Sequence, residues 1–335
     1  ASYPWRKIRS EPMNLLTILI IVALALAFVN GMIDAANVVS TAVSSRTIPP
    51  RRALFLAAAA EFAGPFIFGV AVARTIGSEL IESSALSLPM ILASMLAAIF
   101  WNILTFWLAI PSSSSHSLLG GLLGAAMLSS GFAVVKMGGL LTILLALLLS
   151  PIAGLIFGYL LMKLTLWSVR KASPRINTLF QKMQYITFLG MGLSHGSNDG
   201  QKVMGVITMG LLSGGIIQGF YIPTWVIAAS AGAMALGTIF SGTRLMRTLG
   251  ARIYRIRPIH GFTSQLAAAG VILGAALLGG PVSTTHVMSS AIIGAGAGER
   301  INKVRWGILK DMLIAWFLTI PITAGLAALI LLLLR

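Results

Sequence analysis

Long apolar stretches alternate with short polar segments along the whole chain. Several stretches are as long as the roughly 18 apolar residues that cross the hydrocarbon core of a bilayer as a helix. They lie at 13–30, 53–73, 88–110, 139–162, 184–212, 261–279 and 311–334. The pattern therefore predicts an all-α polytopic membrane protein.

A proline followed by hydroxyl residues interrupts the apolar sequence at two places. The interruptions read PSSSSH (111–116) and PVSTTH (281–286), and a glycine-bearing apolar run follows each one. Proline does not continue a helix, whereas Ser and Thr are favoured at helix N-termini. We therefore expect two re-entrant helical hairpins with hydroxyl residues at their tips. Gly31 and Asp34 place a similar polar interruption inside the first span, which predicts a broken transmembrane helix there.

The polar interruptions form two phrases, and each phrase occurs twice in the same order. GMIDAANVVSTAV (31–43) corresponds to GSNDGQKVMGVIT (196–208), and the two proline-hydroxyl turns correspond at nearly the same offset. This predicts two homologous halves at 13–165 and 185–335. A polar tail at 1–12 precedes them, and a basic cytoplasmic linker at 166–184 separates them.

The basic residues give these halves an orientation. The 335 residues are 57% hydrophobic and only 10% charged, and most of the 24 Lys and Arg residues lie at 46–52, 163–182, 242–257 and 300–310. If each hairpin returns to its starting side, all four loops share one face, and the positive-inside bias makes that face cytoplasmic. The halves then begin on opposite sides, as in the inverted-topology repeats of secondary transporters.

The same bias explains the net charge of +16 without binding to nucleic acid. The chain has no cysteine, which excludes disulfides and metal sites built from thiolates.

Asp34 and Asp199 are expected deep in the membrane. An ionised carboxylate at the centre of a membrane helix costs about 2.5–3.5 kcal/mol on insertion scales, so each needs a cation, a proton or a basic side chain as a partner. Carboxylate and amide oxygens suit a hard cation such as Na⁺. The candidate cation ligands are Asp34, Asn37, Asn198, Asp199, Gln201 and Glu61. The alternatives are a structural Asp199–Lys202 pair and, for Glu61, a neutral acid hydrogen-bonded between helices.

The hydroxyl turns are candidates for anion binding. The first backbone N–H groups of a helix have no partner within the helix and favour negative charge. Ser113, Ser114, Ser115, Ser283, Thr284 and Thr285 would add uncharged donors at two such termini. Lys202 would either contact the anion or balance Asp199. His116 and His286 end the two turns, where bracing of each hairpin is favoured over a ligand or proton-relay role.

At these residues the chain resembles the inorganic phosphate transporter (PiT) family, over about 13–334. The most specific segments are SHGSNDGQKVMGVIT (194–208) and GPVSTTHVMSSAIIGAGAG (280–298). The resemblance implies inverted repeats, re-entrant hairpins and cation-coupled uptake of phosphate. It implies that Asp34, Asn37, Asn198 and Asp199 bind the coupling cation and phosphate, and that the six hydroxyl residues hold phosphate.

Two departures from the family pattern bear on the coupling ion. Met32 and Ile33 stand where the family usually has Ala-Asn, and Gln265 stands where the family has a glutamate. Both remove polar or acidic groups near the expected site. They therefore affect how many cations are coupled and which cation is used.

The resulting hypothesis is a non-enzymatic, multi-pass secondary transporter of the cell membrane. It imports inorganic phosphate with Na⁺ as the favoured coupling cation, or H⁺, and needs no other cofactor. Phosphate would lie near mid-membrane between the hairpin tips, bound by the six hydroxyls with Asp34, Asn37, Asp199 and Lys202. The alternatives are a permease for sulfate or another tetrahedral oxyanion, an anion channel and an intramembrane hydrolase. Homo-oligomerisation is left open.

Overall fold

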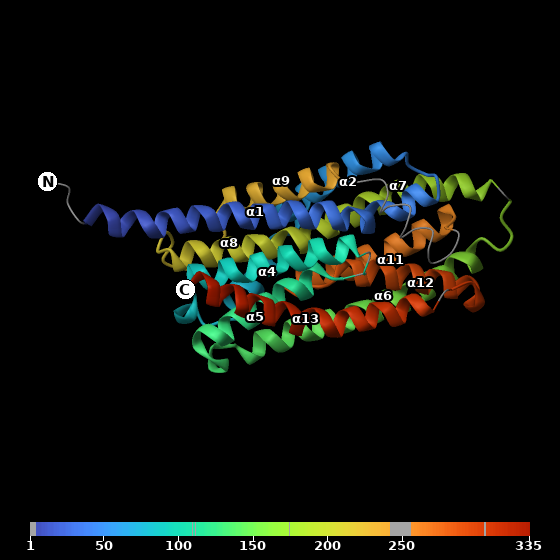
Figure 1. Cartoon of the computed structure of the whole chain (residues 1–335). Helices are drawn as coiled ribbons and strands as arrows, with labels where there is room; N and C mark the ends of the chain where they lie inside the picture. Colours follow the sequence, from blue (N-terminus) through green and yellow to red (C-terminus); the bar gives the residue numbers. More distant parts are fainter. Residues whose placement is uncertain (1–4, 109, 111, 174, 242–255, 305) are drawn as a thin grey trace.

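The protein is an elongated bundle of helices packed side by side (Figure 1). The computed structural model describes residues 5–335 except 109, 111, 174, 242–255 and 305. Residues 1–4 of the expected tail, Pro111 of the first turn and most of the basic loop expected at 242–257 lie outside the described residues. The described ranges contain helices and no strand, apart from an isolated bridge between Ile81 and Val135. The predicted all-α class is confirmed.

Five helices in the described part of the chain are long and apolar enough to cross a membrane. They are α1 (Trp5–Ser44), α4 (Leu88–Trp107), α6 (Met137–Ser168), α11 (Pro258–Leu277) and α13 (Gly307–Leu334). On α6 and α13, large aliphatic side chains point outward along much of the helix. An all-round apolar helix with an exposed aliphatic face is suited to contact with lipid.

The predicted break in the first span is wrong, because α1 continues unbroken through Gly31 and Asp34 to Ser44. The polar side chains of this segment find partners on other helices, so the backbone hydrogen bonds need not open. Gly31 instead allows close packing: a Cβ there would collide with the backbone carbonyl of Met234 in α9 (Thr224–Ile239).

The second predicted span, expected to be continuous over 53–73, is broken instead. The helices α2 (Pro50–Phe68) and α3 (Ala71–Ser78) meet at an angle of 77°. Gly69 in the junction has a φ of 81°, in the left-handed region that side-chain-bearing residues rarely adopt. Glycine at this position therefore permits the bend.

The second copy of the aspartate phrase also departs from a regular α-helix. A π-helical turn at Gly196–Gly200 joins α7 (Ile176–His195) to α8 (Gln201–Ser213). π-Turns are rare and frequently occur at functional sites. The helix that contains this turn runs in the opposite direction to α1 (Figure 1). This is the arrangement an inverted repeat would have, and the repeat itself remains an interpretation of the sequence.

Each proline-hydroxyl turn joins two helices that lie side by side. The first turn joins α4 to α5 (Ser114–Ser130), and the second joins α11 to α12 (Thr284–Glu299). The first pair packs against α13 of the second half, whereas the second pair packs against α6 of the first half. Each half therefore supplies the outer wall for the hairpin of the other half. Whether the hairpins are re-entrant depends on the membrane boundary and stays a prediction.

Glycines allow the closest helix contacts, as small residues commonly do in membrane proteins. In the α6–α12 contact, a Cβ at Gly294 would collide with the carbonyl oxygen of Leu155, and one at Gly158 with that of Ala291. In contrast, a Cβ at Gly270, within α11, would meet nothing within 4 Å. The two kinds of helical glycine should respond differently to the same substitution.

We predict that Gly294→Ala lowers the stability of the protein, because overpacking a tight contact costs about 1–3 kcal/mol. The matched control, Gly270→Ala, should leave stability unchanged or raise it, because alanine is favoured over glycine within helices by roughly 0.5–1 kcal/mol. Thermal unfolding of both variants in detergent, followed by tryptophan fluorescence, measures the difference. Equal melting temperatures for the two variants would contradict the assignment of the α6–α12 contact.

Candidate functional site

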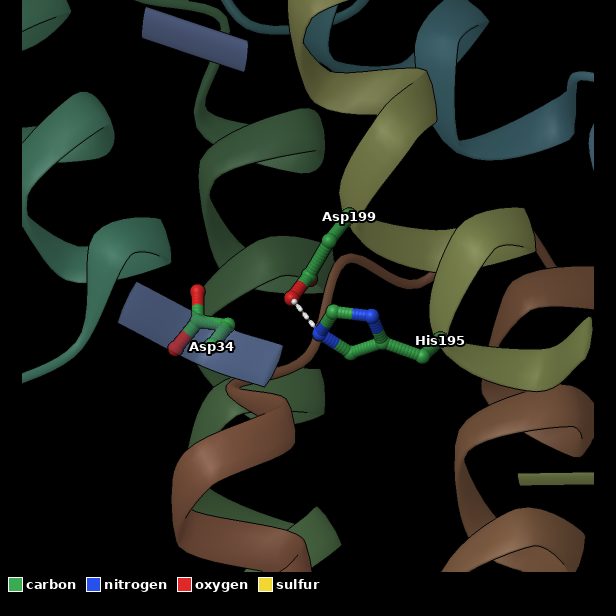
Figure 2. A group of neighbouring side chains, drawn as sticks. All are labelled: Asp34, His195 and Asp199. Carbon is green, nitrogen blue, oxygen red and sulfur yellow. Dashed lines mark ion pairs between the residues drawn. The ribbon is translucent and has the colours of Figure 1, made fainter. Parts of the chain in front are cut away.

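Two aspartates from opposite halves of the chain meet near the middle of the bundle. Asp34 lies on α1 and Asp199 on the π-turn, and their exposed fractions are 3% and 2%. Ligand atoms of these two carboxylates and of His195 all lie within 4.8 Å of one another (Figure 2). The doubled phrase of the sequence therefore builds a single buried cluster.

The carboxylate of Asp34 is held by neutral groups from both hairpin tips. Ser114 Oγ donates to Oδ2 at 3.0 Å, and Thr285 Oγ1 donates to Oδ1 at 3.0 Å. Asn37, one turn along α1, donates from Nδ2 to Asp34 Oδ1 at 3.0 Å and to Thr285 Oγ1 at 2.8 Å. No lysine or arginine of the described residues forms an ion pair with Asp34. This half of the cluster is therefore rich in oxygen and lacks a basic side chain.

The carboxylate of Asp199 has a cationic partner. Thr284 Oγ1 donates to its Oδ2 at 2.6 Å, and the Lys202 ammonium donates to its Oδ1. The same ammonium donates to Ser115 Oγ and, at 2.8 Å, to the carbonyl oxygen of Val282. Lys202 is only 1% exposed. Its charge is therefore neutralised within the protein, at the point where both tips converge.

The two half-sites match residue by residue. In each one, a hydroxyl of the half's own tip donates to the aspartate, and the residue three positions after the aspartate bridges it to a hydroxyl of the opposite tip. The corresponding pairs are Ser114 with Thr284, Thr285 with Ser115, and Asn37 with Lys202. The half-sites differ in charge, because the bridge is an amide in the first and an ammonium in the second.

Asn198 fixes the backbone of the second tip. Its Nδ2 donates to the carbonyl of Gly280 at 3.1 Å, and its Oδ1 accepts from the backbone N–H of Val282 at 3.1 Å. The corresponding residue of the first copy, Ile33, has no polar group that could bond a tip. The second tip is consequently held more firmly by its own half than the first.

Ser113 and Ser283 act as helix caps in this conformation. Their Oγ atoms accept from the backbone N–H groups of His116 at 3.3 Å and His286 at 3.4 Å, which satisfies one free donor at the start of α5 and of α12. The two termini touch, since Ser115 Oγ donates to Val282 O at 2.8 Å.

The histidines that follow the tips pack against each other. The ring centres of His116 and His286 are 5.2 Å apart, and that of Trp316 on α13 lies 4.3 Å from His286. Both imidazoles are buried, and the described residues offer no hydrogen-bond partner to either ring nitrogen of His286. Ring packing of this kind supports the bracing role, which stays a prediction.

His195 is a further member of the cluster, which the sequence did not predict. Its Nε2 lies 3.0 Å from Asp199 Oδ2, and its Nδ1 lies 3.0 Å from Glu61 Oε1. The other oxygen of Glu61 accepts from Thr238 at 2.5 Å. The spacing of His195, one helical turn before Asp199, could have indicated it. The doubled pattern does not include it, because the first copy has Asn30 at the corresponding position.

Two expected cation ligands do not reach the central carboxylates directly. Among the described residues, Glu61 is linked to Asp199 through His195. Gln201 faces the bend between α2 and α3, where Nε2 donates to Gly69 O at 2.6 Å and Oε1 accepts from the backbone N–H of Ala73 at 3.2 Å. The structure therefore gives Gln201 contacts that hold the α2–α3 junction to α8.

The buried charges of the cluster do not balance. Asp34, Asp199 and Glu61 are carboxylates, whereas Lys202 and His195 are the only basic groups bonded to them among the described residues. Even with a protonated imidazole, three ionised carboxylates exceed two positive charges. A buried net negative charge is unfavourable in an apolar surrounding, so the cluster favours a bound cation or proton.

The space at the tips is small in this conformation. A cavity of about 10 Å³ is bordered by Ser115, Lys202 and Pro281 together with apolar side chains. This is room for about one water molecule. Entry of any larger solute would require the tips of α5 and α12 to separate.

Comparison with known proteins places these features in a family. The family model described as "Phosphate transporter family" matches residues 30–327. The chain is 42% identical to a "Probable low-affinity inorganic phosphate transporter" of Bacillus subtilis, over 94% of this chain and 96% of the relative. It is 40% identical to a protein of the same description from Rhizobium meliloti, over 94% and 95% of the two chains.

A solved structure has the same fold. It is described as "The sodium-dependent phosphate transporter", and it superimposes with a TM-score of 0.86 at 25% sequence identity. The match covers 96% of this chain and 99% of that one. The similarity therefore extends over the whole bundle, including both hairpins.

We predict that Asn198→Ala loosens the second tip selectively. The Gly280 carbonyl and the Val282 N–H would lose their partner, and an unsatisfied buried polar group costs about 1–3 kcal/mol. Hydrogen–deuterium exchange should become faster in peptides covering 279–283 and stay unchanged in those covering 112–116. Equal acceleration at both tips, or none at either, would contradict the role assigned to Asn198.

Proposed function

The chain belongs to the phosphate transporter family, and from this we propose that it imports inorganic phosphate together with a cation, with Na⁺ favoured over H⁺. As a member of the family it is a multi-pass membrane transporter and not an enzyme, which removes the hydrolase alternative. Our proposal concerns the direction of transport, the coupling ion and the binding residues. Location in the plasma membrane with the basic loops in the cytoplasm is proposed on the charge pattern.

The observation that carries the proposal is the meeting of two hydroxyl-bearing helix termini over two buried carboxylates. The N-termini of α5 and α12 meet, since Ser115 of α5 donates to Val282 beside the start of α12. The tip of α5 supplies a hydroxyl to Asp34, and the tip of α12 supplies one to each aspartate. Helix N-termini bind anions through free N–H groups and the helix dipole. Phosphate would bind there, with the donors Ser113, Ser114, Ser115, Ser283, Thr284 and Thr285 and with the positive charge of Lys202 nearby.

The carboxylates favour phosphate over sulfate. At neutral pH phosphate carries at least one O–H group, which can donate to Asp34 or Asp199, whereas sulfate has no proton to donate. A carboxylate facing sulfate would add repulsion without a compensating hydrogen bond. A sulfate permease nevertheless remains the second candidate, because both anions are tetrahedral and the hydroxyl donors would fit either.

The cation would bind beside Asp34. No lysine or arginine in the described part of the chain pairs with this carboxylate, which is surrounded by the hydroxyls of Ser114 and Thr285 and by the Asn37 amide. Oxygen ligands suit a hard cation. The description of the solved relative as sodium-dependent supports Na⁺ as the cation. Among the other expected ligands, Asp199 would add charge, and Asn198, Gln201 and Glu61 would hold the surrounding backbone and side chains in place.

A direct test is uptake by proteoliposomes that contain the purified protein. We predict that an inward Na⁺ gradient drives accumulation of labelled phosphate above its equilibrium level, and that collapse of the gradient by an ionophore releases it. Unlabelled phosphate should compete more strongly than sulfate. Absence of accumulation under Na⁺ and H⁺ gradients alike would refute coupled transport, while stronger competition by sulfate would favour the second candidate.

We further predict that Asp34→Asn impairs the response to the cation. The amide keeps the size of the carboxylate but loses its charge, and a hydrogen bond or contact to a charged group contributes about 1.5–3 kcal/mol. The Na⁺ concentration for half-maximal uptake should rise roughly 10- to 100-fold. Thr142→Ala, on the exposed face of α6, is the matched control. Unaltered Na⁺ dependence in Asp34→Asn would remove this residue from the cation site.

A further inference from the structure

The ammonium of Lys202 has the surroundings of a bound metal cation. Its three oxygen partners are a carboxylate oxygen of Asp199, the hydroxyl of Ser115 and the backbone carbonyl of Val282. Unwound backbone carbonyls hold Na⁺ in transporters with interrupted helices. Carboxylate and other oxygen ligands suit hard cations in general. The partners also come from three separate elements, namely the π-turn and the tips of both hairpins.

This arrangement exceeds what a structural ion pair would need. A pair between Asp199 and Lys202, three residues apart, could form on one helix without any further partner. Here the ammonium also bonds the two tips whose separation would open the site. The ammonium therefore links residues of both halves where the two tips meet.

In the first half-site, Asn37 occupies the position that Lys202 has in the second. Asn37 bridges Asp34 to Thr285 as Lys202 bridges Asp199 to Ser115, but the amide has no charge. The first half-site consequently has a carboxylate without a fixed counter-charge, and the second has one with a counter-charge that is part of the chain. Only the first would need a cation from solution.

We propose that the Lys202 ammonium is a resident cation, which occupies the place of a coupling Na⁺ in the second half-site. The inference rests on the proposed function and deepens it: of two pseudo-symmetric cation positions, one is filled permanently and only the Asp34 position exchanges its ion. Because the ammonium is tethered, it cannot leave with phosphate. Each transport cycle then carries one cation fewer than two open positions would allow.

The chain itself suggests the variant that tests this. Lys202→Asn gives the second half-site the residue of the first, removes the tethered charge and leaves space beside Ser115 and Asp199, next to the existing cavity. Lys202→Met is the matched control, since methionine removes the charge but fills similar space and offers no oxygen. Lys202→Arg retains the charge.

The experiment counts the Na⁺ ions bound by the purified full-length protein. Equilibrium binding of ²²Na⁺ is measured in detergent, with choline as the replacing cation, for the wild type and the three variants. Lys202→Asn should bind one Na⁺ more than the wild type, and its melting temperature should depend more steeply on Na⁺. Lys202→Met and Lys202→Arg should gain none. A Lys202→Asn protein that folds and binds no additional Na⁺ overturns the proposal.

The wild type alone provides a second test, in case Lys202→Asn does not fold. Wild-type protein that already binds two Na⁺ ions, with Asp34→Asn removing only one of them, overturns the proposal. Binding of one Na⁺, removed by Asp34→Asn, supports it, and binding of none overturns it. These counts do not depend on transport, so failure of phosphate uptake would refute the proposed function while leaving the resident-cation proposal to be judged by the binding data.

Discussion

Burial of ionisable groups in an apolar bundle is the constraint on which the rest of the structure depends. Lipid offers no partner to a carboxylate, so the partners of Asp34 and Asp199 must come from the protein or from a bound ion. A continuous helix has no spare backbone donors at its centre, whereas an interrupted one presents hydroxyls and free N–H groups there. The proline-hydroxyl turns supply these groups, and each tip bonds to residues of both halves.

This constraint explains why so much of the arrangement could be predicted from the sequence. A doubled aspartate and a doubled hydroxyl turn in apolar sequence have few partners other than each other, so their meeting could be expected from the repeated phrases and the family resemblance. The positions of the helix breaks could not be predicted in this way. Gly31 lies in polar sequence and Gly69 in apolar sequence (65–73, PFIFGVAVA), yet α1 is continuous at the first and the chain bends at the second. The difference arises from packing against α9 and from the hydrogen bonds of Gln201, neither of which is visible in local sequence.

The residues that were missed or misplaced are those at which the two copies differ. His195 corresponds to Asn30 in the first copy, and Gln201 has no counterpart there that bonds a bent junction. The repeat pattern therefore does not predict the roles of these two residues. The copies nevertheless differ in a consistent direction. Asn198 and Lys202 fix the second half-site through backbone and charge, whereas Ile33 and Asn37 leave the first one less constrained and give the Asp34 carboxylate no counter-charge. An exchange of ions is easier where fewer fixed groups compete for the carboxylate.

The hydroxyl groups connect the two proposed ligands. Ser114 and Thr285 now direct their O–H groups at Asp34, and Thr284 directs its O–H group at Asp199. A hydroxyl has one proton to donate, so it cannot bond a carboxylate and an anion at the same time. A cation that neutralised Asp34 would weaken the hydrogen bonds from Ser114 and Thr285 to the carboxylate. Their O–H groups could then rotate and donate to phosphate. Cation binding would then precede anion binding for a local chemical reason. Since Ser114 and Thr285 belong to opposite tips, the same exchange would also release one bridge that keeps the tips together.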